Sequence, residues 1–368
     1  MFELTNEQRK YLGITLVSSA WDFIKLIPSQ YDKHDTFAYF DGNTIRKRIL
    51  IGKNSYVEYD LNGETANDRT ELLPKTERGK IVKLTASTLE KRTPKGMYFS
   101  YNNGYVHIGN CETNRTFYNS SSEEIKFENF EELSYWIEQW VSDTTISDLN
   151  ELAEFSSSHK KHCKYRVGDF FKFKLNRRLY GYGRILLDYD KMRKEKIKFW
   201  DILMGKPLVV KVYHIATTNK NINCGELKEL EAIPSQFIMD NAVFYGEYEV
   251  IGNLPLTDNE LDFPVMYGKS IDATDSNKIL LQSGEKYFEL TNRNRALYSA
   301  FRNNGIGFGI EVKLPVLKKC IELHSNQPYW EQNNYITDKD LRNPKFGAER
   351  KMICKEFGVS EDEIFLTK

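Results

Sequence analysis

The sequence predicts an α+β protein of two domains, each with a mainly antiparallel, strand-rich core and a few helices. Its 368 residues exceed what a single domain usually holds. Tyr and Phe occur 22 times each, and aromatic residues favour strands. Alternating apolar runs are separated by turn signals such as Asp41-Gly42, whereas apolar residues recur at helical spacing in only a few places.

The first part of the chain is predicted to begin with a short helix and to continue as strands. Thr5 and Gln8 have the spacing of a helix capping box. Residues 38–59 alternate as strands around the Asp41-Gly42 turn. Residues 55–61 form another strand, which we expect Asn62-Gly63 to end. Residues 97–118 hold a further hairpin whose turn is residues 102–104.

An aromatic amphipathic helix is predicted to close the N-terminal domain. Asn129 can cap its first turn, and Glu132 lies at the capping-box position. The apolar face at helical spacing consists of Phe130, Leu133, Trp136, Ile137 and Trp140. A short helix is expected over residues 147–155, and the polar, unpatterned residues 156–162 predict a linker. We therefore predict an N-terminal α+β domain of unknown role over residues 1–155 and a second α+β domain, with C-terminal helices, over residues 163–368.

The second domain is organised around residues 165–187, which have the pattern of an antiparallel hairpin with a basic turn. Phe171, Phe173 and Leu175 fall on one face of its first strand. Gly181 and Gly183 lie inside its second strand, where glycine indicates a bulge or the close approach of another backbone.

Three side chains on one face of this second strand are candidate partner contacts. They are Tyr180, Tyr182 and Arg184, and Tyr and Arg are the residue types that dominate binding hot spots. The alternative is that the tyrosines only cover a half-exposed sheet, because Tyr often has one apolar and one wet side.

A downstream stretch repeats the pairing of tyrosine with glycine. Residues 237–245 and 247–251 are predicted as two strands around Gly246, and Tyr245, Glu247 and Tyr248 complete the predicted partner-binding set. Residues 208–215 form a buried strand, and residues 278–281 and 286–290 form a hairpin. Helices are predicted over residues 315–324, 337–341 and 348–357, the last one ended by Gly358.

Charge is balanced overall but uneven along the chain. From Glu123 to Glu154 there are ten acidic residues and one lysine, a net charge of −9. From His159 to Lys198 there are fourteen Lys or Arg and four Asp or Glu, a net charge of +10. The two blocks could neutralise each other, face different partners (the acidic one a basic toxin surface), or simply be solvated.

Composition points to a folded cytoplasmic protein without a metal or a cofactor. The polar N-terminus shows no secretory signal, and no apolar run reaches the length of a membrane span. The five cysteines are far apart and form no CxxC pair, so we expect reduced thiols rather than a metal or redox motif.

Several of these segments together resemble the immunity protein 26 family of bacterial polymorphic toxin systems, over roughly residues 164–268. The matching pieces are residues 167–171 (VGDFF), 180–186 (YGYGRIL), 204–208 (MGKPL), 210–213 (VKVY), 234–238 (PSQFI) and 244–248 (FYGEY). The resemblance implies a protein that is not an enzyme and that binds and neutralises a cognate toxin, often a nuclease. The resemblance implies no catalytic residue in this sequence.

Two other function classes stay open from the sequence. Basic stretches with interleaved aromatics, at residues 46–48, 75–83 and 160–198, would suit single-stranded nucleic acid, although no known RNA-binding signature is present. A hydrolase or nuclease needs a nucleophile, a base and an orienting group, and no spacing in the sequence assembles them. Oligomeric state is not predicted.

Overall fold

The computed structural model describes residues 2–28, 34–199, 205–269, 277–293, 295–298, 309–332, 334 and 336–365. By its internal contacts the chain divides into two compact units. The N-terminal unit is Met1–Lys161 with Asn176–Arg178, and the C-terminal unit is His162–Leu175 with Leu179–Lys368. The predicted α+β class is confirmed, since every strand pair in both units is antiparallel and helices accompany each sheet. Two independent domains stay a prediction.

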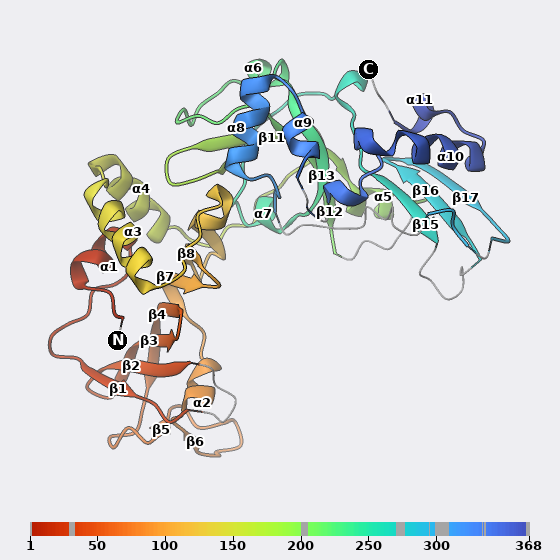
Figure 1. Cartoon of the computed structure of the whole chain (residues 1–368). Coiled ribbons are helices and arrows are strands. Elements are labelled where there is room, and N and C mark those ends of the chain that lie inside the picture. Colours follow the sequence, from red (N-terminus) through yellow and green to blue (C-terminus); the bar gives the residue numbers. More distant parts are fainter. Residues whose placement is uncertain are drawn as a thin grey trace. The chain divides into compact units, whose positions relative to one another are not determined.

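The N-terminal unit is built on a seven-stranded antiparallel sheet in the order β1-β2-β3-β4-β7-β8-β9 (Figure 1). These strands are β1 (Asp22–Lys25), β2 (Asp35–Asp41), β3 (Thr44–Gly52), β4 (Ser55–Glu64), β7 (Lys95–Asn102), β8 (Tyr105–Asn110) and β9 (Arg115–Asn119). A two-stranded ribbon and a short helix are inserted between β4 and β7, namely β5 (Glu71–Leu72), β6 (Val82–Lys83) and α2 (Ala86–Glu90). The remaining helices are α1 (Asn6–Leu12), η1 (Ser120–Glu123), α3 (Phe130–Ser142) and α4 (Ile146–Ser156).

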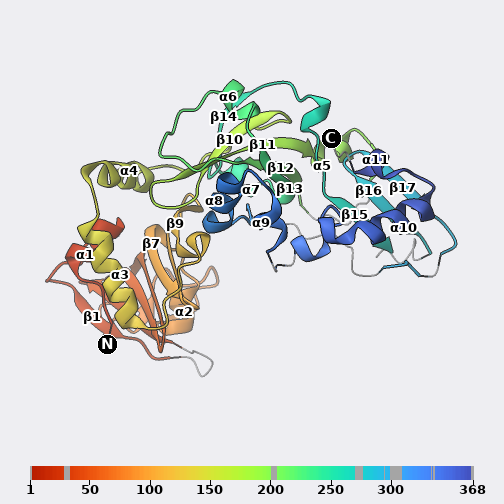
Figure 2. The same cartoon turned by 45° about the horizontal axis from the view of Figure 1, so that its top comes forward.

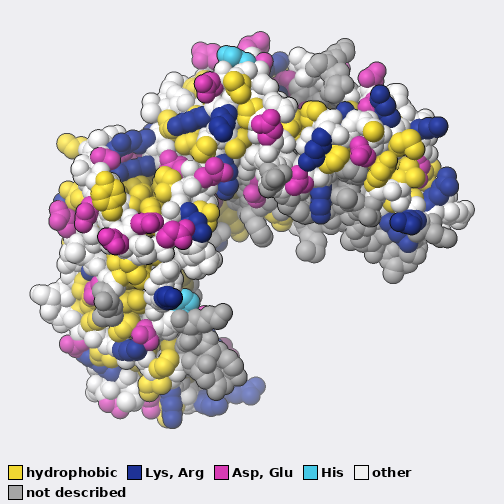
Figure 3. All heavy atoms as spheres, in the orientation of Figure 1, with side chains coloured by type: hydrophobic (Ala, Val, Ile, Leu, Met, Phe, Trp, Pro, Cys, Tyr) yellow, Lys and Arg dark blue, Asp and Glu magenta, His cyan; other side chains and the backbone are white. Residues whose placement is uncertain are grey.

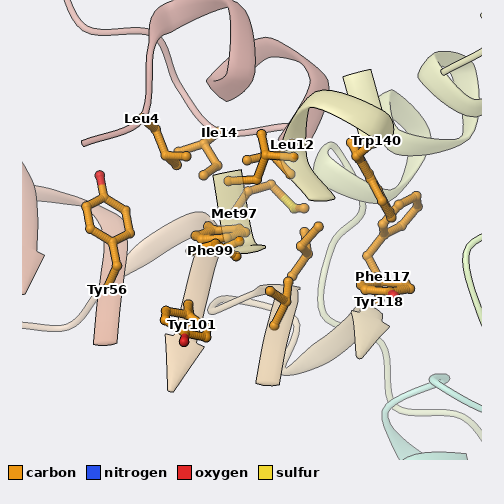
Figure 4. Close-up of a cluster of buried hydrophobic side chains, with 14 of the residues drawn as sticks. Leu4, Leu12, Ile14, Tyr56, Met97, Phe99, Tyr101, Phe117, Tyr118 and Trp140 are labelled. Carbon is orange, nitrogen blue, oxygen red and sulfur yellow. The ribbon is translucent and has the colours of Figure 1, made fainter. Parts of the chain in front are cut away.

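Helices cover one face of this sheet. Leu12 of α1, Leu133 and Trp140 of α3, and Leu152 of α4 join the aromatic side chains of the strands in one buried cluster (Figure 4). Burying such side chains is the main favourable term in folding. The opposite face packs against β5, β6 and α2 through a second cluster that includes Phe40. The alternation of the strands therefore buries both faces of the sheet.

A buried ion cluster fixes the pairing of β3 and β4 beneath α1. Glu58 and Lys47 are fully buried, and the Nζ atom of Lys47 lies 3.1 Å from Glu58 and 2.7 Å from Asp60. The Arg9 guanidinium donates to the same Glu58 at 2.8 Å, and the hydroxyl of Tyr56 donates to it at 2.6 Å. A buried carboxylate is tolerated because these donors satisfy it.

The C-terminal unit contains two sheets. The first has five strands in the order β13-β12-β11-β10-β14: β10 (Asp169–Lys174), β11 (Tyr180–Asp188), β12 (Pro207–Tyr213), β13 (Ala232–Met239) and β14 (Glu249–Asn253). The second has three: β15 (Val265–Lys269), β16 (Ile279–Ser283) and β17 (Lys286–Leu290). Its described helices are α5 (Tyr189–Lys194), α6 (Cys224–Lys228), α7 (Asn241–Phe244), η2 (Asp258–Glu260), α8 (Leu314–Leu323), α9 (Gln327–Trp330), η4 (Thr337–Lys339), η5 (Pro344–Phe346), α10 (Gly347–Phe357) and α11 (Glu361–Ile364).

Each of these two sheets has its own helical cover (Figure 2). Leu317 of α8 and Tyr329 of α9 are buried with Phe171 and Phe173 of β10 against the five-stranded sheet. Ile353 of α10 and the helix α11 pack against the three-stranded sheet. The predicted hairpin over residues 278–290 and the helices over residues 315–324 and 348–357 are confirmed.

Three local predictions are wrong for identifiable reasons. Strand β4 continues through Asn62-Gly63, because a bulge opposite residues 45–47 lets Gly63 pair with Ile45. The strand predicted over residues 237–245 ends at Met239, since carbonyl contacts of Asp240 begin a helical turn there. Only a single 3₁₀ turn forms within residues 337–341.

Candidate partner-binding site

The predicted tyrosine face of β11 is buried. Tyr180 and Tyr182 do share a face, and they lie in one cluster with Phe170 of the neighbouring strand. The hydroxyl of Tyr182 donates to the carbonyl of Asn219 at 2.6 Å, and the backbone of Tyr180 pairs with that of Thr217. The connection between β12 and α6 therefore covers this face, which fits the alternative that the tyrosines cover a sheet.

Two glycines in β11 make room on its other face. Gly181 and Gly183 lie opposite the rings of Phe173 and Phe171. A Cβ atom on Gly183 would lie 2.4 Å from Cζ of Phe171 and 2.6 Å from the carbonyl oxygen of Lys211. The predicted close approach of another backbone is thus confirmed at Gly183.

Arg184 lies at the centre of a buried polar cluster. Its side chain is fully buried, and its guanidinium lies 4.3 Å from the centre of the Phe170 ring. It donates to a carboxylate oxygen of Glu260 and, at 3.1 Å, to the carbonyl of Pro255. A further donation, from Nε to the carbonyl of Gly168, measures 3.3 Å. These bonds connect β11 to the segment before η2, so Arg184 is a structural anchor here.

Glu260 is the residue of this cluster that sequence reasoning missed. The backbone N–H and the hydroxyl of Thr257 donate to it at 2.9 and 2.7 Å, and Lys211 and Lys228 each lie 3.8 Å from it. Burial by itself would raise the pKa of Glu260, but the Thr257 hydrogen bonds and the charges of Arg184 and Lys211 outweigh it, and the pKa is lowered. The capping-box spacing of Thr257 and Glu260 was the available sequence signal.

The second predicted stretch divides into a buried and an accessible part. Tyr248 is 8% exposed, its ring stacks on Phe171 at 5.4 Å, and its hydroxyl accepts the N–H of Ile310 at 2.8 Å. Burial raises the pKa of Tyr248. Tyr245 and Glu247 are half-buried at the turn around Gly246, whose φ of +72° is one that glycine adopts readily.

Around Tyr245 there is an accessible aromatic patch. The exposed ring of His162 stacks on Phe244 with centres 4.7 Å apart, and it lies 5.9 Å from the ring of Tyr245. The backbone N–H of Cys163 donates to the carbonyl of Phe244 at 2.7 Å, which holds the two segments together. We call His162, Phe244, Tyr245 and Glu247 the His162 patch.

A cavity of about 420 Å³ opens beside α5 in the same unit. Its walls are mainly apolar, and five charged residues also line it: Asp188, Lys191, Glu195, Glu285 and Lys286. It is lined by Val167, Leu186, Leu187, Asp188, Lys191, Met192, Glu195, Leu256, Leu261, Phe263, Ser283, Glu285, Lys286 and Ile364. A site of this size and composition suits a buried apolar side chain or a small ligand.

Contacts of the basic turn Asn176–Arg178 lie within the N-terminal unit. Arg178 donates to both carboxylate oxygens of Asp148, at 3.0 and 2.7 Å, and the Arg177 guanidinium lies 3.9 Å from the centre of the Trp140 ring. The Arg178 hydrogen bond is the main cause that holds the pKa of Asp148 well below its usual range. Asp148 belongs to the acidic block (residues 123–154) and Arg178 to the basic block (residues 159–198), so these two blocks are in contact here.

Metal-binding clusters and membrane-spanning helices are both absent from the described part of the chain. Its residues contain no group of three or more His, Cys, Asp or Glu side chains placed to hold a metal ion, and all five cysteines are free. No described helix combines the length and the apolar character that crossing a membrane requires.

Comparison with known proteins gives one match. Residues 166–279 match the family model "Immunity protein 26", which confirms the resemblance predicted over roughly residues 164–268. No curated protein and no solved structure matches the chain. The matched segment runs from the residues before β10 to the start of β16, and it contains Arg184, Glu260 and most of the His162 patch. Residues 166–279, under a third of the chain, are thus similar to the immunity protein 26 family.

Proposed function

We propose that the chain is a non-enzymatic immunity protein that binds a cognate bacterial toxin and neutralises it by masking its active or substrate-binding surface. The observation that carries this proposal is the immunity protein 26 match over residues 166–279. Neutralisation requires only a surface that excludes the substrate of the toxin, so no catalytic residue is needed. We expect the protein to bind the toxin in the cytoplasm.

A nuclease is the toxin class that the charge distribution favours. A nuclease must present a basic surface to bind the phosphate backbone of its substrate. The stretch from Glu123 to Glu154 carries a net charge of −9, and Asp and Glu side chains gather on the surface over α3 (Figure 3). Glu131, Glu132 and Glu138 are exposed there, beside a Tyr135 side chain that is 65% exposed. Such a face attracts a basic protein and competes with nucleic acid.

The His162 patch is the partner contact that we propose within the family segment. Of the six predicted contact residues, Tyr245 and Glu247 have accessible side chains, whereas Tyr180, Tyr182, Arg184 and Tyr248 are buried. A buried side chain does not touch a protein that docks on the surface, so we assign these four to positioning the strands. An accessible tyrosine among aromatic neighbours is a typical hot spot.

The test is capture of partners from a lysate of the native cells by the tagged full-length protein, with and without nuclease treatment, followed by mass spectrometry. We expect one toxin-like protein in stoichiometric amount that survives nuclease treatment and moderate salt. The double variant Tyr245→Ala/Glu247→Lys should lower its apparent affinity about tenfold or more. A matched control is Tyr105→Ala/Glu322→Lys, which alters an exposed tyrosine and an exposed glutamate elsewhere.

Capture that disappears on nuclease treatment would instead support the alternative, a nucleic-acid-binding protein. The structure weakens that alternative in one respect. Most aromatics within the basic stretch, including Phe170, Tyr180 and Tyr182, are buried and offer no free face on which a base could stack, although Tyr165 is only half-buried.

A further inference from the structure

The N-terminal unit contains an open groove of about 870 Å³ that the family match does not reach. It lies on the sheet face opposite α1 and α3, between the end of β1 and the β5–β6 ribbon. Its lining residues are Ile24, Lys25, Leu26, Ile27, Phe40, Arg69, Thr70, Glu71, Gly79, Lys80, Ile81, Lys83, Leu84 and Thr85. The basic stretch at residues 75–83 contributes Gly79, Lys80, Ile81 and Lys83 to one wall.

The lining of this groove is basic, although two of its cations already have partners: Lys25 lies 2.7 Å from Asp35, and Arg69 lies 2.7 Å from Asp22. Four cations, Lys25, Arg69, Lys80 and Lys83, line it with one carboxylate, that of Glu71, which gives a net charge of +3. Figure 3 shows Lys and Arg side chains along the lower edge of the view, where β5 and β6 lie. Within the described part of the chain, the ammonium groups of Lys80 and Lys83 have no ion-pair partner. A ligand with carboxylates would supply the missing countercharge.

The groove is also aliphatic, and part of this surface is exposed. Ile27 is 71% exposed and Ile81 is 49% exposed, although both belong to the most apolar class of side chain. Ile24, Leu26 and Leu84 continue the same surface inward. Large exposed aliphatic side chains gathered in a concave site indicate that an apolar surface is buried there on binding.

A free sheet edge borders the groove. β1 is the terminal strand of the seven-stranded sheet, paired only with β2 among the described strands. An edge strand presents unpaired backbone groups that an extended segment can join by β-augmentation. The four residues of β1 with Leu26 span about 16 Å at roughly 3.3 Å per residue, enough for a partner segment of about five residues. The carbonyl of Ile27 already accepts the N–H of Ala86, at 3.2 Å.

We propose that this groove docks an extended segment of a partner protein in which Asp or Glu residues alternate with aliphatic residues. A segment that lies across the groove can bring its carboxylates to Lys80 and Lys83 and its aliphatic side chains to Ile27 and Ile81. A single-stranded nucleic acid fits less well because the one aromatic lining residue, Phe40, is fully buried and its ring is covered by Arg69 at 4.9 Å. This inference goes beyond the toxin-neutralising function and does not depend on it.

The test uses the full-length protein and a fluorescein-labelled peptide with the central sequence Asp-Leu-Glu-Ile-Asp-Val, read by fluorescence anisotropy. Two probes accompany it: the same peptide with lysine at the acidic positions, and a labelled single-stranded oligonucleotide of six nucleotides. We expect saturable binding of the acidic peptide, at least tenfold tighter than that of either other probe, and weaker binding at higher salt.

Matched variants locate the site. Lys80→Glu/Lys83→Glu should weaken acidic-peptide binding at least tenfold. The control Lys53→Glu/Lys91→Glu alters two exposed lysines outside the groove and changes the net charge equally, so it should alter peptide binding less than twofold. Ile27→Ser/Ile81→Ser should also weaken it without altering the circular dichroism spectrum. The proposal would be overturned if both lysine pairs weakened peptide binding equally, if the oligonucleotide bound more tightly, or if peptide binding did not saturate. Concentration-dependent dimerisation that the peptide cannot compete with would overturn it as well.

Discussion

Arg184 offers the sharpest test of whether the central hairpin is a contact surface or a structural anchor. In the structure Arg184 is fully buried and joins Glu260 to the carbonyls of Gly168 and Pro255. Arg184→Met keeps a long apolar side chain but removes the charge and every donor. The variant should therefore destabilise the C-terminal unit before it affects any partner.

These contacts set the expected loss in the free energy of unfolding. Removing one partner of a buried ion pair costs about 3–5 kcal/mol, because the other charge stays buried without compensation. Lys211 and Lys228 remain 3.8 Å from Glu260 and keep part of its countercharge, so we expect the lower end, about 3 kcal/mol. Adding Glu260→Gln removes the stranded charge, and about 1–2 kcal/mol should be recovered.

Urea unfolding followed by circular dichroism measures these differences, with Arg166→Met as the control. The Arg166 side chain is 76% exposed, and its loss should cost less than about 0.5 kcal/mol. If Arg184→Met lost less than about 1 kcal/mol yet abolished capture of a partner, the anchor role would be refuted and direct contact favoured.

Two further predictions follow from single contacts. Gly183→Ala should lower the free energy of unfolding by about 1–3 kcal/mol, because the new methyl group would overlap Phe171 and the backbone of Lys211. The same urea experiment measures this loss. The control Gly63→Ala, whose methyl group would lie 3.9 Å from its nearest neighbour, should cost less. Asp148 has a lowered pKa, chiefly through the Arg178 hydrogen bond, so its contribution is present above the unfolded-state pKa of about 3.9 and is lost as the pH falls below it. Since Arg178 is 45% exposed, we expect this ion pair to contribute only about 1 kcal/mol to the free energy of unfolding. Asp148→Asn should remove that acid-sensitive contribution when stability is measured between about pH 5 and 2. An unchanged pH profile of stability would contradict the assignment.

Local signals in the sequence predicted much of the fold. The Thr5–Gln8 capping box forms with both hydrogen bonds, at 3.2 and 2.9 Å, and Asn129 caps α3 as expected. Hydrophobic periodicity placed Phe171 and Phe173 on one face of β10 and the aromatic face of α3 in the core. These features depend on residues a few positions apart, which a sequence shows directly.

The candidate site was less predictable because burial depends on distant segments. Period-two alternation correctly put Tyr180, Tyr182 and Arg184 on one face, but it does not say whether another segment covers that face. Here the cover comes from residues around Asn219, and the partner of Arg184 is Glu260, 76 positions away. The accessible stacking of His162 on Phe244 likewise joins two segments that no spacing rule connects.

The central claim is that this chain neutralises a toxin by binding it, and one titration tests it most directly. The protein captured from the native lysate would be purified, its toxic activity assayed, and the full-length chain added in increasing amounts. We predict that activity falls to background at one equivalent, and that Tyr245→Ala/Glu247→Lys shifts the curve to higher concentration while Tyr105→Ala/Glu322→Lys does not. Full activity in the presence of excess folded chain would contradict the account.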